Sequence, residues 1–208
     1  MASNDLAALS RREMCETLER LGPDAPTLCE GWTTADLAAH LVVREHDPLA
    51  LPGIAVPRLA GSLTERRMAA TKSKGFAANV ATIRKGRPLL LRAAPAMVDV
   101  GEMYLHTEDC RRANGEGPRS LDPEREGALW SWLGLAGRLF ARRVRAGVRV
   151  RTPDGRERDL KGGREVVTLT GPPSELVLYL TGRRTAAKVE LSGDPAAIAA
   201  LERATLSI

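Results

Sequence analysis

Residues 27–41 of this 208-residue chain read TLCEGWTTADLAAHL, a loop of turn-forming residues that leads through Trp32 into a helix. Thr33 or Thr34 can cap that helix, because a threonine oxygen accepts a hydrogen bond from a backbone N–H group of the first turn. The apolar residues that follow recur at helical spacing. His40 therefore falls close to the buried edge of the helix, where it either packs without a ligand or faces a site inside a bundle.

The remainder of the first two thirds of the chain also predicts helices. Apolar residues recur every three or four positions, and glycine, proline or Asn-Gly pairs end each run. Besides the helix that carries His40, this pattern predicts helices over residues 6–21, 62–84, 95–113 and 122–144. A proline-rich connection from Pro48 to Pro57 follows the His40 helix. These helices predict an antiparallel bundle over residues 1–144.

The pattern changes near Ala146, after which apolar and polar residues alternate as they do in strands. Strands are predicted over residues 148–152, 156–160, 165–170 and 187–191. A short helix is predicted over residues 175–180, and a final helix, capped by Asp194, over residues 195–206. We therefore predict a small α+β domain over residues 145–208 and assign the chain to the α+β class.

Glu102 and His106 are the best indication of chemistry, because the chain has only three histidines. On a helix their positions share a face with Cβ atoms about 5–6 Å apart, so the pair could bind one cation, and His40 could add a third ligand. Two histidines and one carboxylate are a recurrent ligand set for divalent metals and leave a coordination position open. Asp109 shares the face and could orient His106. A surface ion pair is the alternative interpretation of the spacing.

The composition argues against several classes of protein. Aromatic residues make up 3% of the chain, too few for the stacking platforms of single-strand binders, although the run from Arg138 to Arg151 could bind phosphates. The three cysteines, Cys15, Cys29 and Cys110, form no Cys-x-x-Cys pair and favour neither disulfides nor a structural zinc site. No segment has the pattern of a signal peptide or a membrane span, so we expect a cytoplasmic protein without a membrane partner.

Residues 27–41 resemble the C-x-G-W-x-x-x-D-x-x-A-H-L signature of the DinB-like, mycothiol-dependent maleylpyruvate isomerase superfamily. The segment Glu102-x-x-x-His106-x-x-Asp109 is similar to the second metal-bearing segment of that family. Residues 178–183 and 189–194 are similar to its C-terminal domain, and residues 40–45 resemble an actinobacterial subgroup of predicted metal-binding proteins.

This resemblance implies a DinB-like helical bundle followed by a small α+β domain. It implies that His40, Glu102 and His106 hold a divalent metal, normally zinc, and that Asp109 and Arg183 help to hold a thiol cofactor such as mycothiol. The activity implied is that of a thiol-dependent isomerase or S-transferase acting on a small electrophilic substrate. The metal-activated thiol would be the nucleophile, so no further catalytic residue is expected.

Two other functions stay open. A protein of the same fold could bind a metal or a ligand without catalysing a reaction. An arginine-rich nucleic-acid binder is the least favoured of the three, because acidic residues follow the arginine run and aromatic residues are scarce.

Overall fold

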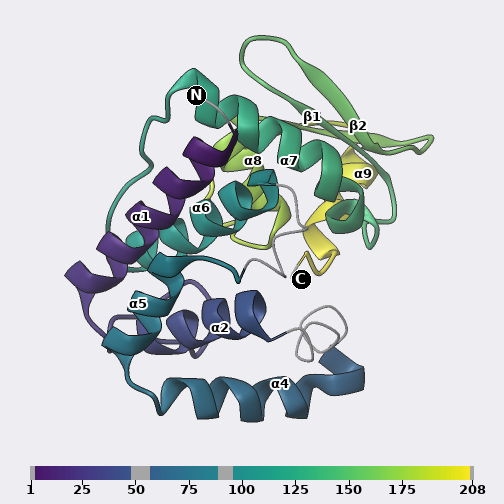
Figure 1. Cartoon of the computed structure of the whole chain (residues 1–208). Helices are drawn as coiled ribbons and strands as arrows, with labels where there is room; N and C mark the ends of the chain where they lie inside the picture. Colours follow the sequence, from purple (N-terminus) through teal and green to yellow (C-terminus); the bar gives the residue numbers. More distant parts are fainter. Residues whose placement is uncertain (1–2, 48–56, 89–95, 207–208) are drawn as a thin grey trace. The chain divides into compact units, whose positions relative to one another are not determined.

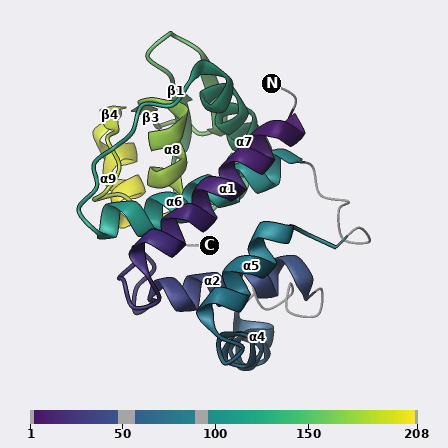
Figure 2. The same ribbon diagram turned by 60° about the vertical axis from the view of Figure 1, so that its left-hand side comes forward.

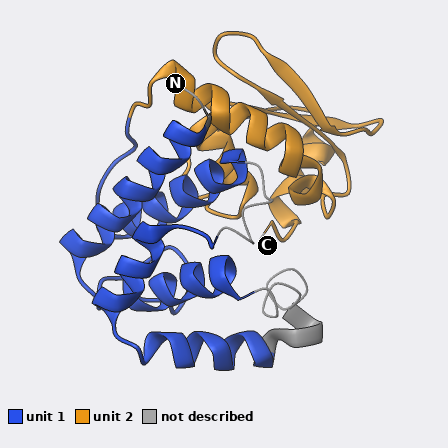
Figure 3. Cartoon of the chain, in the orientation of Figure 1, with its two compact units in different colours: residues 1–119 blue, residues 120–208 orange. Residues whose placement is uncertain are grey.

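The structure of the chain, a computed structural model, describes residues 3–47, 57–88 and 96–206 (Figure 1). It divides into two compact units, residues 1–119 and residues 120–208 (Figure 3). The first unit is helical and the second contains a four-stranded sheet, so the predicted α+β class is confirmed. Among the described residues, no helix combines the length and the apolar character that crossing a membrane requires.

The described part of the first unit consists of α1 (Ser3–Leu21), α2 (Thr34–His46), α4 (Pro57–Lys72), α5 (Phe76–Lys85) and α6 (Ala96–Ala113). Helices α1 and α6 lie side by side in both views (Figures 1 and 2), and α2 packs against α4 and α5. Large apolar side chains recur at helical spacing, so each helix turns one face inward. The fully buried residues of this core include Met14, Leu18, Leu37, Leu41, Ile83 and Met103.

The prediction of one helix over residues 62–84 is wrong. Helix α4 ends at Lys72 and α5 begins at Phe76, and Gly75 between them has a φ of 97°. Only glycine adopts this left-handed conformation without steric cost, so the chain turns here. The predicted proline-rich connection falls mostly on residues 48–56, which lie outside the described residues, as does the start of the predicted fourth helix at residue 95.

The loop before α2 fixes where that helix begins. Of the two predicted caps, Thr33 takes the N-cap position, and the Asp36 carboxylate accepts hydrogen bonds from its N–H at 3.1 Å and its hydroxyl at 2.9 Å. The N–H of Leu28 donates to the backbone oxygen of Asp109 at 3.0 Å. This bond attaches the loop to α6 and brings the two segments singled out in the sequence together.

The second unit combines helices with a mixed sheet. Its elements are α7 (Pro123–Ala141), β1 (Gly147–Arg151), β2 (Glu157–Lys161), β3 (Val166–Thr170), α8 (Pro173–Leu180), β4 (Glu190–Gly193) and α9 (Pro195–Arg203). The strand order is β2-β1-β3-β4, in which β1 and β3 are parallel and the two outer pairs are antiparallel. Every residue of α8 is buried, which makes it the central helix of this unit.

The predicted elements of the second unit are largely confirmed. The first three strands lie within a residue or two of the prediction, whereas β4 begins at Glu190 instead of residue 187. Asp194 caps α9 as predicted, because its carboxylate accepts the N–H of Ala196 at 2.8 Å. The helix itself ends at Arg203, three residues before the predicted end.

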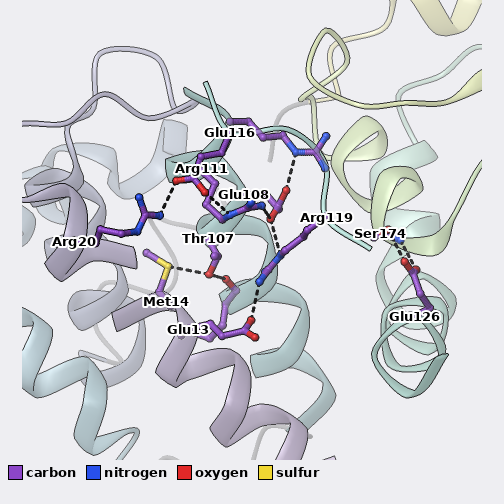
Figure 4. A network of polar contacts seen from close by, with 12 residues as sticks. Glu13, Met14, Arg20, Thr107, Glu108, Arg111, Glu116, Arg119, Glu126 and Ser174 are labelled. Carbon is purple, nitrogen blue, oxygen red and sulfur yellow. Dashed lines mark hydrogen bonds and ion pairs between the residues drawn. The ribbon is translucent and has the colours of Figure 1, made fainter. Parts of the chain in front are cut away.

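Helix α7 groups with the sheet, so the two compact units meet at residues 119 and 120, whereas the predicted domain boundary lies at residues 144 and 145. Gly137 of α7 lies so close to the Leu160 side chain of β2 that a Cβ atom there would be 2.7 Å from it. The Glu126 carboxylate accepts the backbone N–H of Ser174 at 2.9 Å and its hydroxyl at 2.7 Å (Figure 4). These contacts are tertiary, and the helical pattern of α7 does not reveal them.

A buried carboxylate on α6 anchors the end of the first unit (Figure 4). Glu108 is fully buried, and its oxygens lie 2.9 Å from Arg111, 2.7 Å from Arg112 and 2.9 Å from Arg119. Arg119 also pairs with Glu13 of α1 at 2.9 Å. A buried charge is tolerated only when it is paired and hydrogen-bonded, and Glu108 meets that condition with three guanidinium groups.

We expect Glu108→Gln to lower the free energy of unfolding by about 3 kcal/mol, because it leaves partly buried guanidinium groups without their anion. Urea unfolding followed by circular dichroism measures this loss. Glu157→Gln is the matched control, since its pair with Arg151 is exposed and should contribute less than about 1 kcal/mol. Equal losses in the two variants would contradict the anchoring role of Glu108.

Candidate metal centre

Helices α2 and α6 place His40 beside His106, and Glu102 lies next to His106 on α6. The ring centroids of His40 and His106 are 5.5 Å apart in a T-shaped arrangement. The Nε2 atom of His106 lies 3.6 Å from the Glu102 carboxylate one turn earlier on α6. The side chains of Glu102 and His106 are only 14% and 8% exposed, so the alternative of a surface ion pair does not hold.

His40 is held in an environment that keeps its imidazole neutral. Its ring lies 5.1 Å from that of Trp32, which is half-buried at the end of the preceding loop. Burial, and then the nearby charge of His106, lower the pKa of His40 to about 3. At neutral pH this histidine therefore offers a free lone pair, which is the form that binds a metal.

Asp109 orients His106. Its carboxylate is fully buried and lies 2.9 Å from the Nδ1 atom of His106, and it also accepts a hydrogen bond from the Cys29 thiol at 3.3 Å. Because a carboxylate only accepts, the proton of this contact belongs to Nδ1, and Nε2 is left to face Glu102. Burial opposes protonation of His106, but its bonds with Asp109, Cys29 and Glu102 raise its pKa well above the usual value.

Arg44 is a member of this cluster that the sequence analysis did not assign a role. It lies one turn after His40 on α2, and its guanidinium is 2.8 Å from the Glu102 carboxylate. Burial opposes ionisation of Glu102, but the bond with His106 and the charge of Arg44 lower its pKa to about 2. The i, i+4 spacing from His40 could have identified Arg44, because it places both side chains on one face of the helix.

Among the described residues, the set of donor atoms close enough to hold a metal ion is a different one, which shares only His106 with the predicted set. Atoms of Cys29, His106 and Asp109 lie within 4.8 Å of one another and could hold a metal ion. This set would use Nδ1 of His106, whereas the predicted set uses Nε2. The hydrogen bond to Asp109 favours Nε2 as the metal-binding atom, since metal-binding histidines commonly donate their other N–H to a carboxylate.

The remaining candidates lie elsewhere. Arg183 is in the second unit, where its guanidinium donates to the backbone oxygen of Thr181 at 2.7 Å, and its part in holding a thiol stays a prediction. Cys15 and Cys110 are fully buried, and burial raises the pKa of both, that of Cys110 to about 12. Neither therefore has the character of a reactive thiol.

Residues 123–200, which begin with α7, match the family model described as the MDMPI C-terminal domain. These residues are therefore similar to the MDMPI C-terminal domain. Two solved structures share the fold of the chain. A mycothiol-dependent maleylpyruvate isomerase aligns with a TM-score of 0.60 and 16% identity over 91% of each chain. A histidine-to-alanine mutant of a mycothiol-dependent maleylpyruvate isomerase aligns with a TM-score of 0.59 and 15% identity, over 93% of this chain and 95% of that one.

The resemblance to the DinB-like, mycothiol-dependent maleylpyruvate isomerase superfamily is thereby confirmed, as is the fold it implies. None of the curated proteins matches the chain. The MDMPI C-terminal domain covers most of the second unit, whereas His40, Glu102 and His106 lie in the first. The ligand set therefore rests on its own geometry and on the sequence signature around His40.

We expect Asp109→Asn to lower the pKa of His106, because the amide removes the negative charge that faces Nδ1. The nitrogen chemical shifts of the imidazole ring, followed against pH in chelator-treated protein, measure the change. Asp47→Asn is the control, since Asp47 pairs with Arg67 instead of a histidine of the cluster. If His106 titrated identically in wild type and in Asp109→Asn, Asp109 would not be the group that orients it.

Proposed function

We propose that the chain holds a divalent metal, zinc in the first instance, through His40, Glu102 and His106, and uses it to activate a small thiol such as mycothiol. The reaction would be an isomerisation, transfer or conjugation of a small electrophile. The observation that carries this proposal is the orientation of His106: Asp109 binds Nδ1 at 2.9 Å, and Nε2 faces Glu102 beside the ring of His40.

The residues present fit a divalent metal. Two imidazoles and one carboxylate are a recurrent donor set for zinc and leave a coordination position for another ligand. His40 is neutral, and Asp109 supplies the outer carboxylate that raises the basicity of a ligating histidine. The negative charges that raise the pKa of His106 favour any cation at the same place, so the surroundings that stabilise an imidazolium also suit a metal ion.

When bound, a divalent cation in such a site lowers the pKa of an incoming thiol and so supplies a thiolate at neutral pH. The protein residues then have positioning roles. Asp109 and Trp32 fix the two imidazole rings, and Arg44 offsets the charge of Glu102. The Nη1 atom of Arg44 is buried and finds no hydrogen-bond partner among the described residues, which leaves a donor for an anionic group of the thiol or substrate.

The ion pair of Arg44 with Glu102 also supports the second candidate function, a protein that binds a metal or a ligand without turnover. Arg44 already compensates the charge of Glu102 at 2.8 Å, so this carboxylate has a partner in the absence of a metal or a substrate. Thiol consumption by metal-loaded protein, assayed with mycothiol and a panel of small electrophiles, separates the two functions. Thiol consumption that stops when a chelator removes the metal supports an enzyme. Metal binding without thiol consumption supports a binding protein without turnover.

We expect wild-type protein to bind one zinc ion, and His40→Ala and His106→Ala to weaken zinc affinity at least about 100-fold, because each removes a ligand atom. Elemental analysis and competition with a chelating dye measure stoichiometry and affinity. His46→Ala is the matched control, since it removes the chain's other histidine, which lies at the end of α2.

Cys29→Ser distinguishes the two overlapping donor sets. If His40, Glu102 and His106 hold the metal, Cys29→Ser keeps most of the zinc affinity and His40→Ala loses it. The reverse pattern would assign the metal to Cys29, His106 and Asp109 and contradict the proposed ligand set. Absence of stoichiometric metal from wild type supplied with zinc would contradict both.

We expect Arg44→Gln to raise zinc affinity by about tenfold, a change equivalent to one pKa unit, because it removes a positive charge that competes for Glu102. The same dye competition measures this change. Arg67→Gln is the charge-matched control, since it breaks the ion pair with Asp47. Weaker zinc binding in Arg44→Gln would show instead that Arg44 is needed to hold Glu102 in position.

A further inference from the structure

The segment that follows α7 and the C-terminal end of α9 line a cavity of about 490 Å³ in the second unit. Six residues line it, namely Arg143, Arg145, Ala200, Arg203, Ala204 and Thr205. Three arginines thus line one concave space, and the lining includes no acidic residue. Two of the three belong to the arginine run that the sequence analysis considered for phosphate binding.

The arginines of this cavity differ from those on the nearby strands. Arg149 pairs with Asp159 at 2.6 Å, Arg151 with Glu157 at 2.6 Å and Arg156 with Asp154 at 2.9 Å. Among residues 120–206, by contrast, the guanidinium groups of Arg145 and Arg203 form no hydrogen bond or ion pair. The arginines near the strands are therefore paired with carboxylates, whereas Arg145 and Arg203 remain available to bind an anion at the cavity.

Arginines near helix C-termini commonly donate hydrogen bonds to the free backbone carbonyl groups there. In this unit other side chains already donate those bonds. Arg184 donates to the backbone oxygens of Leu201 at 2.8 Å and Ala204 at 2.6 Å, at the end of α9. Lys161 donates to the backbone oxygen of Arg142 at 3.0 Å, just after α7. Capping therefore does not account for Arg145 and Arg203.

We propose that this cavity binds a small molecule bearing phosphate groups, with diphosphate as its simplest form. A guanidinium group matches two phosphate oxygens with parallel N–H bonds, so two or three of them suit an anion of several charges. The volume falls in the range of about 300–1,000 Å³ that is usual for small-ligand sites. No aromatic side chain lines the cavity, so it offers no ring on which a nucleic-acid base could stack.

Isothermal titration of the full chain with inorganic diphosphate at low ionic strength tests this site. We expect one diphosphate per chain, bound about tenfold more weakly by Arg145→Gln and by Arg203→Gln, since each substitution removes charge-assisted hydrogen bonds. Arg149→Gln removes the same charge from a guanidinium already paired with Asp159, and should change the affinity less than about twofold.

Three results would overturn the proposal. The first is no detectable binding of diphosphate by wild type. The second is an equal loss in Arg149→Gln and Arg145→Gln, which would indicate general attraction by a basic surface. The third is binding of a single-stranded RNA oligonucleotide but not of diphosphate, which would assign these arginines to a nucleic-acid surface. None of these measurements involves the metal centre, so their outcome is independent of the proposed thiol chemistry.

Discussion

The hydrogen bond between His106 and Asp109 is the interaction on which the rest of the candidate centre depends. Asp109 is fully buried in α6, and a buried carboxylate is costly unless hydrogen-bonded partners surround it. His106 and Cys29 are those partners, and the backbone oxygen of Asp109 also receives the N–H of Leu28. One residue thus holds the loop that precedes α2 against α6. Through that loop it fixes where Trp32 and His40 lie relative to His106.

Two neighbouring carboxylates on α6 are satisfied in different ways, and the difference explains their roles. Glu108 and Asp109 are consecutive, so they point to different sides of a helix that is buried on both. Glu108 meets three guanidinium groups, which bind it through charge-assisted contacts and so anchor this part of α6. Asp109 meets a histidine and a thiol, which are both side-chain types that can bind a metal. Glu108 therefore holds α6 in place, whereas the groups around Asp109 remain available for metal binding.

Local signals in the sequence predict most of the fold and part of the site. Capping by Thr33 and Asp194, and the i, i+4 pair of Glu102 and His106, depend on residues within one turn of each other, and short patterns carry that information. The failed predictions involve contacts that such patterns do not contain. Gly75 divides a region whose helical pattern continues on both sides of it.

Long-range contacts account for what the sequence could not reveal about α7 and the centre. Helix α7 joins the sheet because Gly137 admits the Leu160 side chain, a contact that depends on how the chain folds back. The approach of Cys29 to Asp109 joins positions 80 residues apart. The position of Arg44 one turn after His40 is a local signal that the sequence does contain. Its ion pair with Glu102 is not, because Glu102 belongs to another helix.

In the proposed metal centre, the charge balance of the cluster would link metal binding to proton release. Arg44 and a protonated His106 offset the carboxylates of Glu102 and Asp109, so the cluster is close to neutral with the proton in place. A divalent ion bound at Nε2 of His106 requires the neutral imidazole, and the raised pKa of His106 means that a proton must leave first. His40 imposes no such cost, because its pKa is lowered to about 3 and its ring is already neutral. In the proposed metal centre the two histidines would therefore contribute unequally: His40 would be a ready ligand, whereas His106 would make metal affinity depend on pH.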